Sequence, residues 1–202
     1  MTPRLTPRHR GGERGQSLVE LSLVLPVLLV LLLGLLEFGF VFDHLLTLSY
    51  ASREGARTGA ALADGSALPD CADVDEYVVS AVERVLTSAG SPIRGDLTRV
   101  GEIRVYKADA AGNQVGSAVN VWVPGVGPTV DGRQLSFQLQ SSGWAQCTRS
   151  NATSHPDSIG VSVTYAYRAV TPLAGILDVV GGGGWSTLPM ADRTVMALNP
   201  SD

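Results

Sequence analysis

The chain has 202 residues, of which 17% are charged, and its formal net charge is -4. This length accommodates one compact domain with extensions. The 15 lysines and arginines are mostly dispersed, so the chain offers no basic surface that could follow a phosphate backbone, which argues against nucleic acid as a partner.

The first predicted elements are a basic leader over residues 1–15 and an apolar run from Leu21 to Phe42. The leader contains four arginines and one glutamate: Arg4, Arg8, Arg10, Glu13 and Arg14. The run is long enough to cross, as a helix, a bilayer core of about 30 Å. Because positive residues precede the run, we predict a single-pass protein of the cytoplasmic (inner) membrane with its N-terminus inside and its bulk outside.

A cleaved secretory signal peptide is the alternative for this run. Such a peptide has an apolar stretch of about 7–15 residues and a small-residue cleavage site directly after it. Here the apolar run is longer, and the first matching tripeptide after it, residues 61–63, follows about 20 residues after its end. We therefore favour a membrane helix.

Gly15 lies between the leader and the apolar helix, and Glu20 follows five residues later. A carboxylate at the edge of a membrane helix is costly without a partner. If the chain is cleaved after Gly15, Gln16 acquires an α-amine with a pKa of about 7.7–8.0, and Glu20 of one subunit can neutralise the amine of a neighbour. Alternatively, Glu20 only lies among lipid headgroups at the helix start, where the helix dipole favours it.

The N-terminal quarter contains four groups of residues in a characteristic order: Arg14-Gly15-Gln16-Ser17-Leu18-Val19-Glu20-Leu21, Leu25-Pro26-Val27-Leu28, Glu37-Phe38-Gly39 and Ala51-Ser52-Arg53-Glu54-Gly55-Ala56-Arg57. Gly15 and Glu20 resemble the prepilin peptidase site of type IV pilins. The whole series, over roughly residues 14–60, resembles TadE-like proteins, which are minor pilins or pseudopilins of the tight-adherence (Flp) pilus system. Gln16 and Leu21 stand where pilins commonly have aromatic residues.

The helical pattern continues beyond the apolar run, and we predict one long helix over residues 16–63, about 70 Å in length. Two rows of small residues recur every four positions along its outer half: Ala51, Gly55 and Gly59, and Ser52, Ala56 and Ala60. Residues four apart share a helix face, so these rows form a smooth strip that another backbone can approach closely. The strip suits either the protein's own domain or a neighbouring subunit.

Residues 64–202 are expected to form an extracytoplasmic domain. An amphipathic helix is predicted from Val74 to Leu86, after a D-x-x-E helix start at Asp73. Alternating strands follow at Ile103–Lys107, Val119–Val123, Leu135–Leu139, Ile159–Ala169 and Ala191–Leu198, with a turn at residues 111–113. Helices followed by strands predict an α+β fold in which an antiparallel sheet covers the amphipathic helix.

The segment from Leu173 to Val180 is apolar and precedes four glycines, Gly181 to Gly184. It is expected to be a short helix that touches either the membrane or the long helix, with the glycines as a flexible linker.

The two cysteines, Cys71 and Cys147, lack the spacing of a zinc or redox motif. In an oxidising compartment one disulfide is expected; two free thiols are the alternative. The three histidines stand apart, and the glycine-rich stretches lack the residues of a phosphate-binding loop. We therefore expect no catalytic residues, no cofactor, no metal and no small-molecule substrate.

The resemblance implies a minor pilin or pseudopilin that is processed by a prepilin peptidase and takes part in assembly or priming of an adhesive pilus. Its partners would be the membrane, the peptidase, other pilin subunits and the assembly platform. The alternative is a tethered binding or enzymatic domain whose N-terminal helix is a simple anchor.

Overall fold

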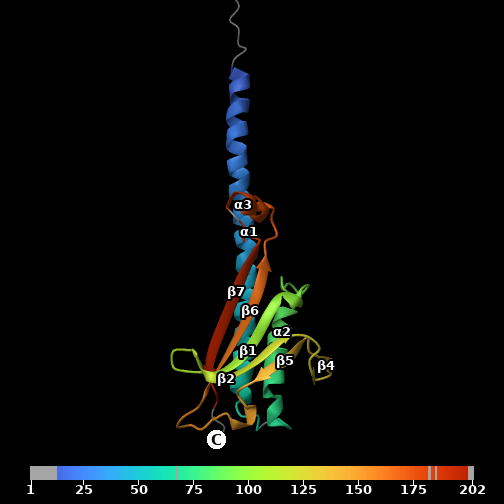
Figure 1. The fold of residues 1–202 in the computed structure, drawn as a ribbon, viewed down its shortest axis with the longest axis vertical. Helices are drawn as coiled ribbons and strands as arrows, with labels where there is room; N and C mark the ends of the chain where they lie inside the picture. Colours follow the sequence, from blue (N-terminus) through green and yellow to red (C-terminus); the bar gives the residue numbers. More distant parts are fainter. Residues whose placement is uncertain (1–12, 67, 182, 185, 200–202) are drawn as a thin grey trace, which may run out of the picture.

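The computed structural model describes residues 13–66, 68–181, 183–184 and 186–199, and it shows a long helix projecting from a small two-layer domain (Figure 1). Most of the predicted leader, residues 1–12, lies outside the described residues. The helices are α1 (Glu13–Leu62), α2 (Val74–Leu86) and α3 (Leu173–Gly181), with short 3₁₀ helices η1 (Cys71–Asp73), η2 (Leu97–Arg99) and η3 (Gln146–Thr148). The strands are β1 (Val100–Ala108), β2 (Gln114–Pro124), β3 (Thr129–Val130), β4 (Arg133–Gln134), β5 (Phe137–Ser142), β6 (Ser158–Arg168) and β7 (Thr187–Ala197).

Five strands form one sheet in the order β5-β2-β1-β6-β7, and every neighbouring pair is antiparallel. The β1–β2 hairpin turns at the predicted residues 111–113. There the Asp109 carboxylate accepts hydrogen bonds from the Ala111 and Asn113 amides, and Gly112 has a φ of +80°. A side chain other than glycine is strained at that φ, so the local sequence fixes this turn.

The domain half of α1 and the whole of α2 lie side by side under one face of the sheet (Figure 1). Gly55 lies where these layers approach closely, because a Cβ on it would stand 2.6 Å from Val82 Cγ2 of α2 and 3.1 Å from Val161 Cγ1 of β6. The predicted α+β class is therefore confirmed. The sheet covers α1 as well as α2, however, so the long helix is part of the core.

The end of α1 is set by a tight turn. Gly65 has a φ of +77°, and a Cβ there would stand 2.6 Å from Cys71 Cα. The Asp64 carboxylate accepts a hydrogen bond from the Ser66 amide at 3.0 Å. This turn reverses the chain, so that η1 and α2 run back along the helix they follow.

The strands differ in their bounds from the sequence prediction, and β5 begins later than its predicted start. Alternation predicts a strand from Leu135 to Leu139, whereas β5 begins at Phe137 and ends at Ser142. The Leu135 amide instead donates a hydrogen bond to the Pro128 carbonyl, and the Leu135 carbonyl accepts one from the Gly127 amide. These two bonds join the ends of the loop that contains β3 and β4. Two-residue strands have no periodicity to detect, so β3 and β4 were not predicted.

Candidate functional site: the N-terminal helix and its junction with the domain

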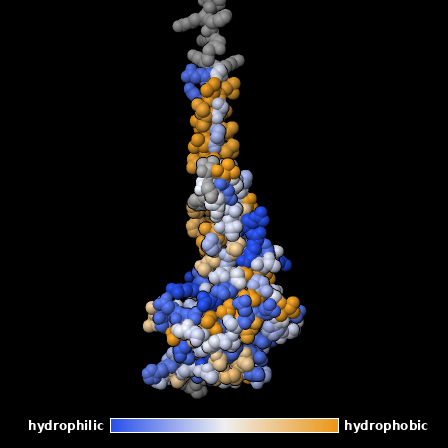
Figure 2. All heavy atoms as spheres, in the orientation of Figure 1, coloured by the Kyte–Doolittle hydropathy of each residue, from blue (hydrophilic) through white to orange (hydrophobic). Residues whose placement is uncertain are grey.

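The N-terminal part of α1, residues 15–32, is exposed along its whole length. Its surface is almost entirely apolar, and it stands clear of the polar domain (Figure 2). Among the described residues, α1 is the one helix long and apolar enough to cross a membrane. We call residues 15–32 the free half of α1. So large an apolar surface in a folded protein indicates a lipid or protein partner.

Gly15, Gln16 and Glu20 lie together at the tip of the free half, on one continuous helix. The Gln16 side-chain amide donates a hydrogen bond to the Glu20 carboxylate at 3.2 Å, one helical turn away. No part of the described domain covers them, so Glu20 remains open to an intermolecular partner.

The small-residue strip lies in the protein's own core. All six of its members are buried: Ala51, Ser52, Gly55, Ala56, Gly59 and Ala60. Ser52 donates a hydrogen bond to Asp192 of β7, and its hydroxyl also lies 2.8 Å from that of Thr194. Of the two packing partners that suit the strip, the structure shows the protein's own domain.

The junction between α1 and the domain is built around Glu37. This carboxylate interrupts the apolar run, and it accepts three hydrogen bonds from the end of β6 and the segment that links β6 to α3. Tyr167 donates through its hydroxyl, Val170 through its amide at 3.1 Å and Thr171 through its amide at 2.9 Å. Glu37 therefore fixes the level on α1 at which the domain begins.

Tyr167 contributes a phenol that remains a donor. Burial raises the pKa of Tyr167, and the Glu37 carboxylate raises it further. His44 lies against the same ring edge to face, with the centroids 4.8 Å apart. The sequence shows Glu37 as a charged residue within an apolar run, which indicates a partner, but it does not identify Tyr167 as that partner.

An apolar cavity of about 280 Å³ opens beside this junction. Its walls come from α1, at Phe38 and Val41, from α3, at Leu173 and Ala174, and from β7, at Leu188. The short helix predicted at residues 173–180 is thus present as α3, and it contacts the long helix. Part of the predicted glycine linker, residue 182, lies outside the described residues.

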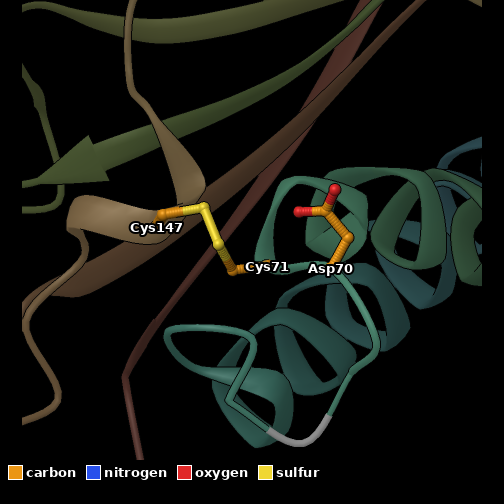
Figure 3. A group of neighbouring side chains, drawn as sticks. All are labelled: Asp70, Cys71 and Cys147. Atoms are coloured by element: carbon orange, nitrogen blue, oxygen red, sulfur yellow. A yellow bond between two sulfur atoms is a disulfide. The ribbon is translucent and has the colours of Figure 1, made fainter.

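At the opposite end of the domain, Cys71 and Cys147 form a disulfide with their Cα atoms 5.2 Å apart (Figure 3). The bridge joins η1, just before α2, to η3, which follows β5. Asp70 lies beside it, but its carboxylate accepts a hydrogen bond from the Ala72 amide and caps η1. Both sulfur atoms are committed to the bridge, so this cluster offers no thiolate to a metal.

Comparison with known families finds one match, and it lies within α1. Residues 15–57 match the family described as TadE-like protein. These residues are a TadE-like segment. No curated protein and no solved structure matches the chain.

The TadE-like segment implies a protein associated with the tight-adherence (Tad) pilus. It includes Gly15, Gln16, Glu20 and Glu37, and it ends within the buried strip, before Gly59. The matched segment thus contains the free half of α1, the Glu37 side of the junction and the first turns of helix that enter the domain core.

Replacement of Glu37 by alanine in the TadE-like segment should release the start of α3 without unfolding the domain. Three donors lose a charged acceptor, and hydrogen bonds to charged groups contribute about 1.5–3 kcal/mol. Hydrogen exchange at the Val170 and Thr171 amides should accelerate by roughly tenfold or more. The control is Glu54→Ala, which removes only an exposed pair with Arg57. If these two amides exchange as slowly in Glu37→Ala as in the unchanged protein, Glu37 does not hold the start of α3 in place.

Proposed function

We propose that the protein is a minor pilin or pseudopilin that is cleaved by a prepilin peptidase after Gly15 and takes part in the assembly or priming of a tight-adherence (Flp-type) pilus for adhesion. One observation carries this proposal: the TadE-like match begins at the expected cleavage site and covers the part of α1 that the domain leaves exposed. A simple core helix would instead be covered by its own domain.

The proposal includes a single membrane span with the N-terminus inside the cytoplasm. Partial burial of α1 begins at residues 33–34. A span of about 20 residues that leaves the domain outside then runs from about Ser17 to Leu36. This is several residues earlier than the apolar run alone indicates, and it puts Glu20 inside the inner leaflet, where a charge needs a partner.

The α-amine of a processed neighbour is the partner that suits Glu20. Cleavage after Gly15 would create this cation on Gln16, four residues from the carboxylate, so adjacent helices with a small axial offset would bring the two charges together. The exposed surface over residues 15–32 would supply the remaining helix contacts with other pilin subunits.

The disulfide supports an extracytoplasmic domain. Structural disulfides persist in oxidising compartments and are rare in the cytosol. The Cys71–Cys147 bridge lies in the part of the chain that the positive-inside rule directs outside.

Glu20→Gln tests the proposal because it removes the charge and keeps the side-chain size. We expect normal amounts of membrane-inserted protein but roughly tenfold fewer assembled pili, since a charge-assisted contact contributes about 1.5–3 kcal/mol. Asp43→Asn is the matched control, because Asp43 is also an exposed carboxylate on α1 but lies beyond the span. Pilus counts in native cells that are equal for the two variants would oppose the assembly role of Glu20.

A tethered extracytoplasmic domain remains the second candidate, because the domain buries the strip of α1 without help from a neighbouring subunit. Replacing residues 16–32 by an unrelated apolar span separates the two, since it leaves Glu37 and the buried part of α1 intact. A tether would keep its function after this exchange. A pilin would lose pilus assembly while its domain stayed folded at the membrane.

A further inference from the structure

We propose that α3 is a second membrane-contacting element, which lies in the outer-leaflet interface with phospholipid acyl chains filling the cavity between α3 and α1. This inference rests on the proposed membrane span. It adds a lipid-binding surface on the domain itself, far along the chain from the TadE-like segment.

The level of α3 on α1 is the first argument. Leu173 Cδ2 lies 3.7 Å from the point where a Cβ on Gly34 would stand, and α3 lies beside the middle of α1, beyond the end of the sheet that is nearer the free half (Figure 1). Gly34 belongs to the apolar run, and a span of about 20 residues from Ser17 ends near Leu36. When α1 is inserted in the membrane, the contact of Leu173 with Gly34 holds α3 at the outer boundary of the hydrocarbon.

The second argument is the distribution of exposed apolar side chains. After residue 64, six large apolar side chains are exposed among the described residues: Val115, Val126, Leu139, Val170, Val179 and Leu188. Three of them, Val170, Val179 and Leu188, belong to the segments around α3, and Val179 is 86% exposed. Leu188 is paired with Tyr167 in the sheet, beside the Glu37 junction. The apolar surface is therefore concentrated at the end of the domain that faces the span.

The polar groups of this region fit a bilayer interface. Backbone amides need protein partners where water is scarce, and Glu37 accepts hydrogen bonds from the amides of Val170 and Thr171 just before α3. Arg168, one residue beyond Tyr167, is exposed at the end of β6. An arginine adjoining an apolar surface can extend to phospholipid phosphates while the apolar side chains contact the acyl region.

The cavity gives the acyl chains a place to bind. It is lined mainly by apolar side chains of α1, α3 and β7, and Gly34 and Phe38 on its wall belong to the apolar run. It is thus continuous with the lipid-exposed surface of the proposed span. An apolar cavity next to a bilayer is filled at low cost by the hydrocarbon that already surrounds it.

A nitroxide at residue 179 tests this placement in the full-length protein. Val179→Cys is purified without reductant, so that the disulfide persists, and is then labelled and reconstituted into phosphatidylcholine–phosphatidylglycerol vesicles. Collision rates are measured with oxygen, which concentrates among acyl chains, and with a water-soluble nickel chelate. Val126→Cys is the matched control, a valine that is 76% exposed in the loop after β2. Leu28→Cys, in the free half of α1, reports the span.

The expected result is a higher ratio of oxygen to nickel collisions at residue 179 than at residue 126, shifted toward the ratio at residue 28. Equal ratios at 179 and 126, with a lipid-like ratio at 28, would overturn the placement of α3 and leave the membrane span intact. Water-like ratios at all three sites would overturn the span as well. Protection of residue 179 from both reagents, with spin–spin broadening, would show that a second copy covers α3 and would also overturn lipid contact.

Discussion

Loss of the Cys71–Cys147 disulfide is expected to lower the free energy of unfolding of the domain by about 4 kcal/mol. The two cysteines are 76 residues apart, and the closed loop contains α2, β1, β2 and β5. A crosslink across so long a loop removes much of the conformational entropy of the unfolded chain. The bridge also anchors η1, from which α2 starts back along α1.

The double variant Cys71→Ser/Cys147→Ser provides the comparison, measured by denaturant unfolding of the full-length protein in detergent. The denaturant concentration at which half of the double variant is unfolded should be well below that of the oxidised protein. Added reductant should lower the unfolding midpoint of the oxidised protein to a similar concentration. Reductant should have no effect on the double variant, which controls for other actions of the reagent. Equal stability of the oxidised and reduced proteins would show that the bridge is dispensable.

Asp75→Ala is expected to destabilise the domain by about 3–5 kcal/mol, because it leaves the buried Arg149 guanidinium without its carboxylate. Both side chains are fully buried, and Arg149 Nη2 donates to Asp75 Oδ1 at 2.7 Å. Burial raises the pKa of Asp75, while Arg149 and the Asn120 amide act in the opposite direction. The charge of Asp75 is therefore tolerated in the core only because these donors surround it.

A second substitution separates the missing pair from a general loss of packing. Arg149→Met, added to Asp75→Ala, should recover part of the lost stability, since the thioether can take the place of the guanidinium 4.1 Å from the centre of the Trp144 ring. Arg57→Ala, which removes the exposed pair with Glu54, should cost under about 1 kcal/mol. A cost for Asp75→Ala as small as that of Arg57→Ala would mean that the buried pair does not stabilise the fold.

The parts of the fold that repeat locally could be predicted from the sequence. The amphipathic pattern predicts α2 with the bounds that the structure shows, Val74–Leu86, because apolar residues recur at helical spacing between an acidic start and Gly90. The absence of proline between Pro26 and Pro69 predicts the length of α1 equally well. The rows of small residues identify the face of α1 that packs closely, although spacing alone leaves the packing partner open.

The contacts that organise the site depend on tertiary structure. Glu37 meets Tyr167 across 130 positions, and Asp75 meets Arg149 across 74. From the sequence, Asp75 is simply one of the carboxylates at the start of α2, and nothing in the residues around Arg149 indicates a buried guanidinium. A charge in an apolar segment signals a partner, but it does not say which of the other residues supplies it.

We propose that α1 is a processed assembly helix and that the mature chain begins at Gln16. The most direct measurement is the N-terminal sequence and intact mass of the protein isolated from its native cells. We expect a mature chain that starts at Gln16, with residues 1–15 removed. An intact chain starting at Met1, or a chain cut beyond Phe42, would contradict it.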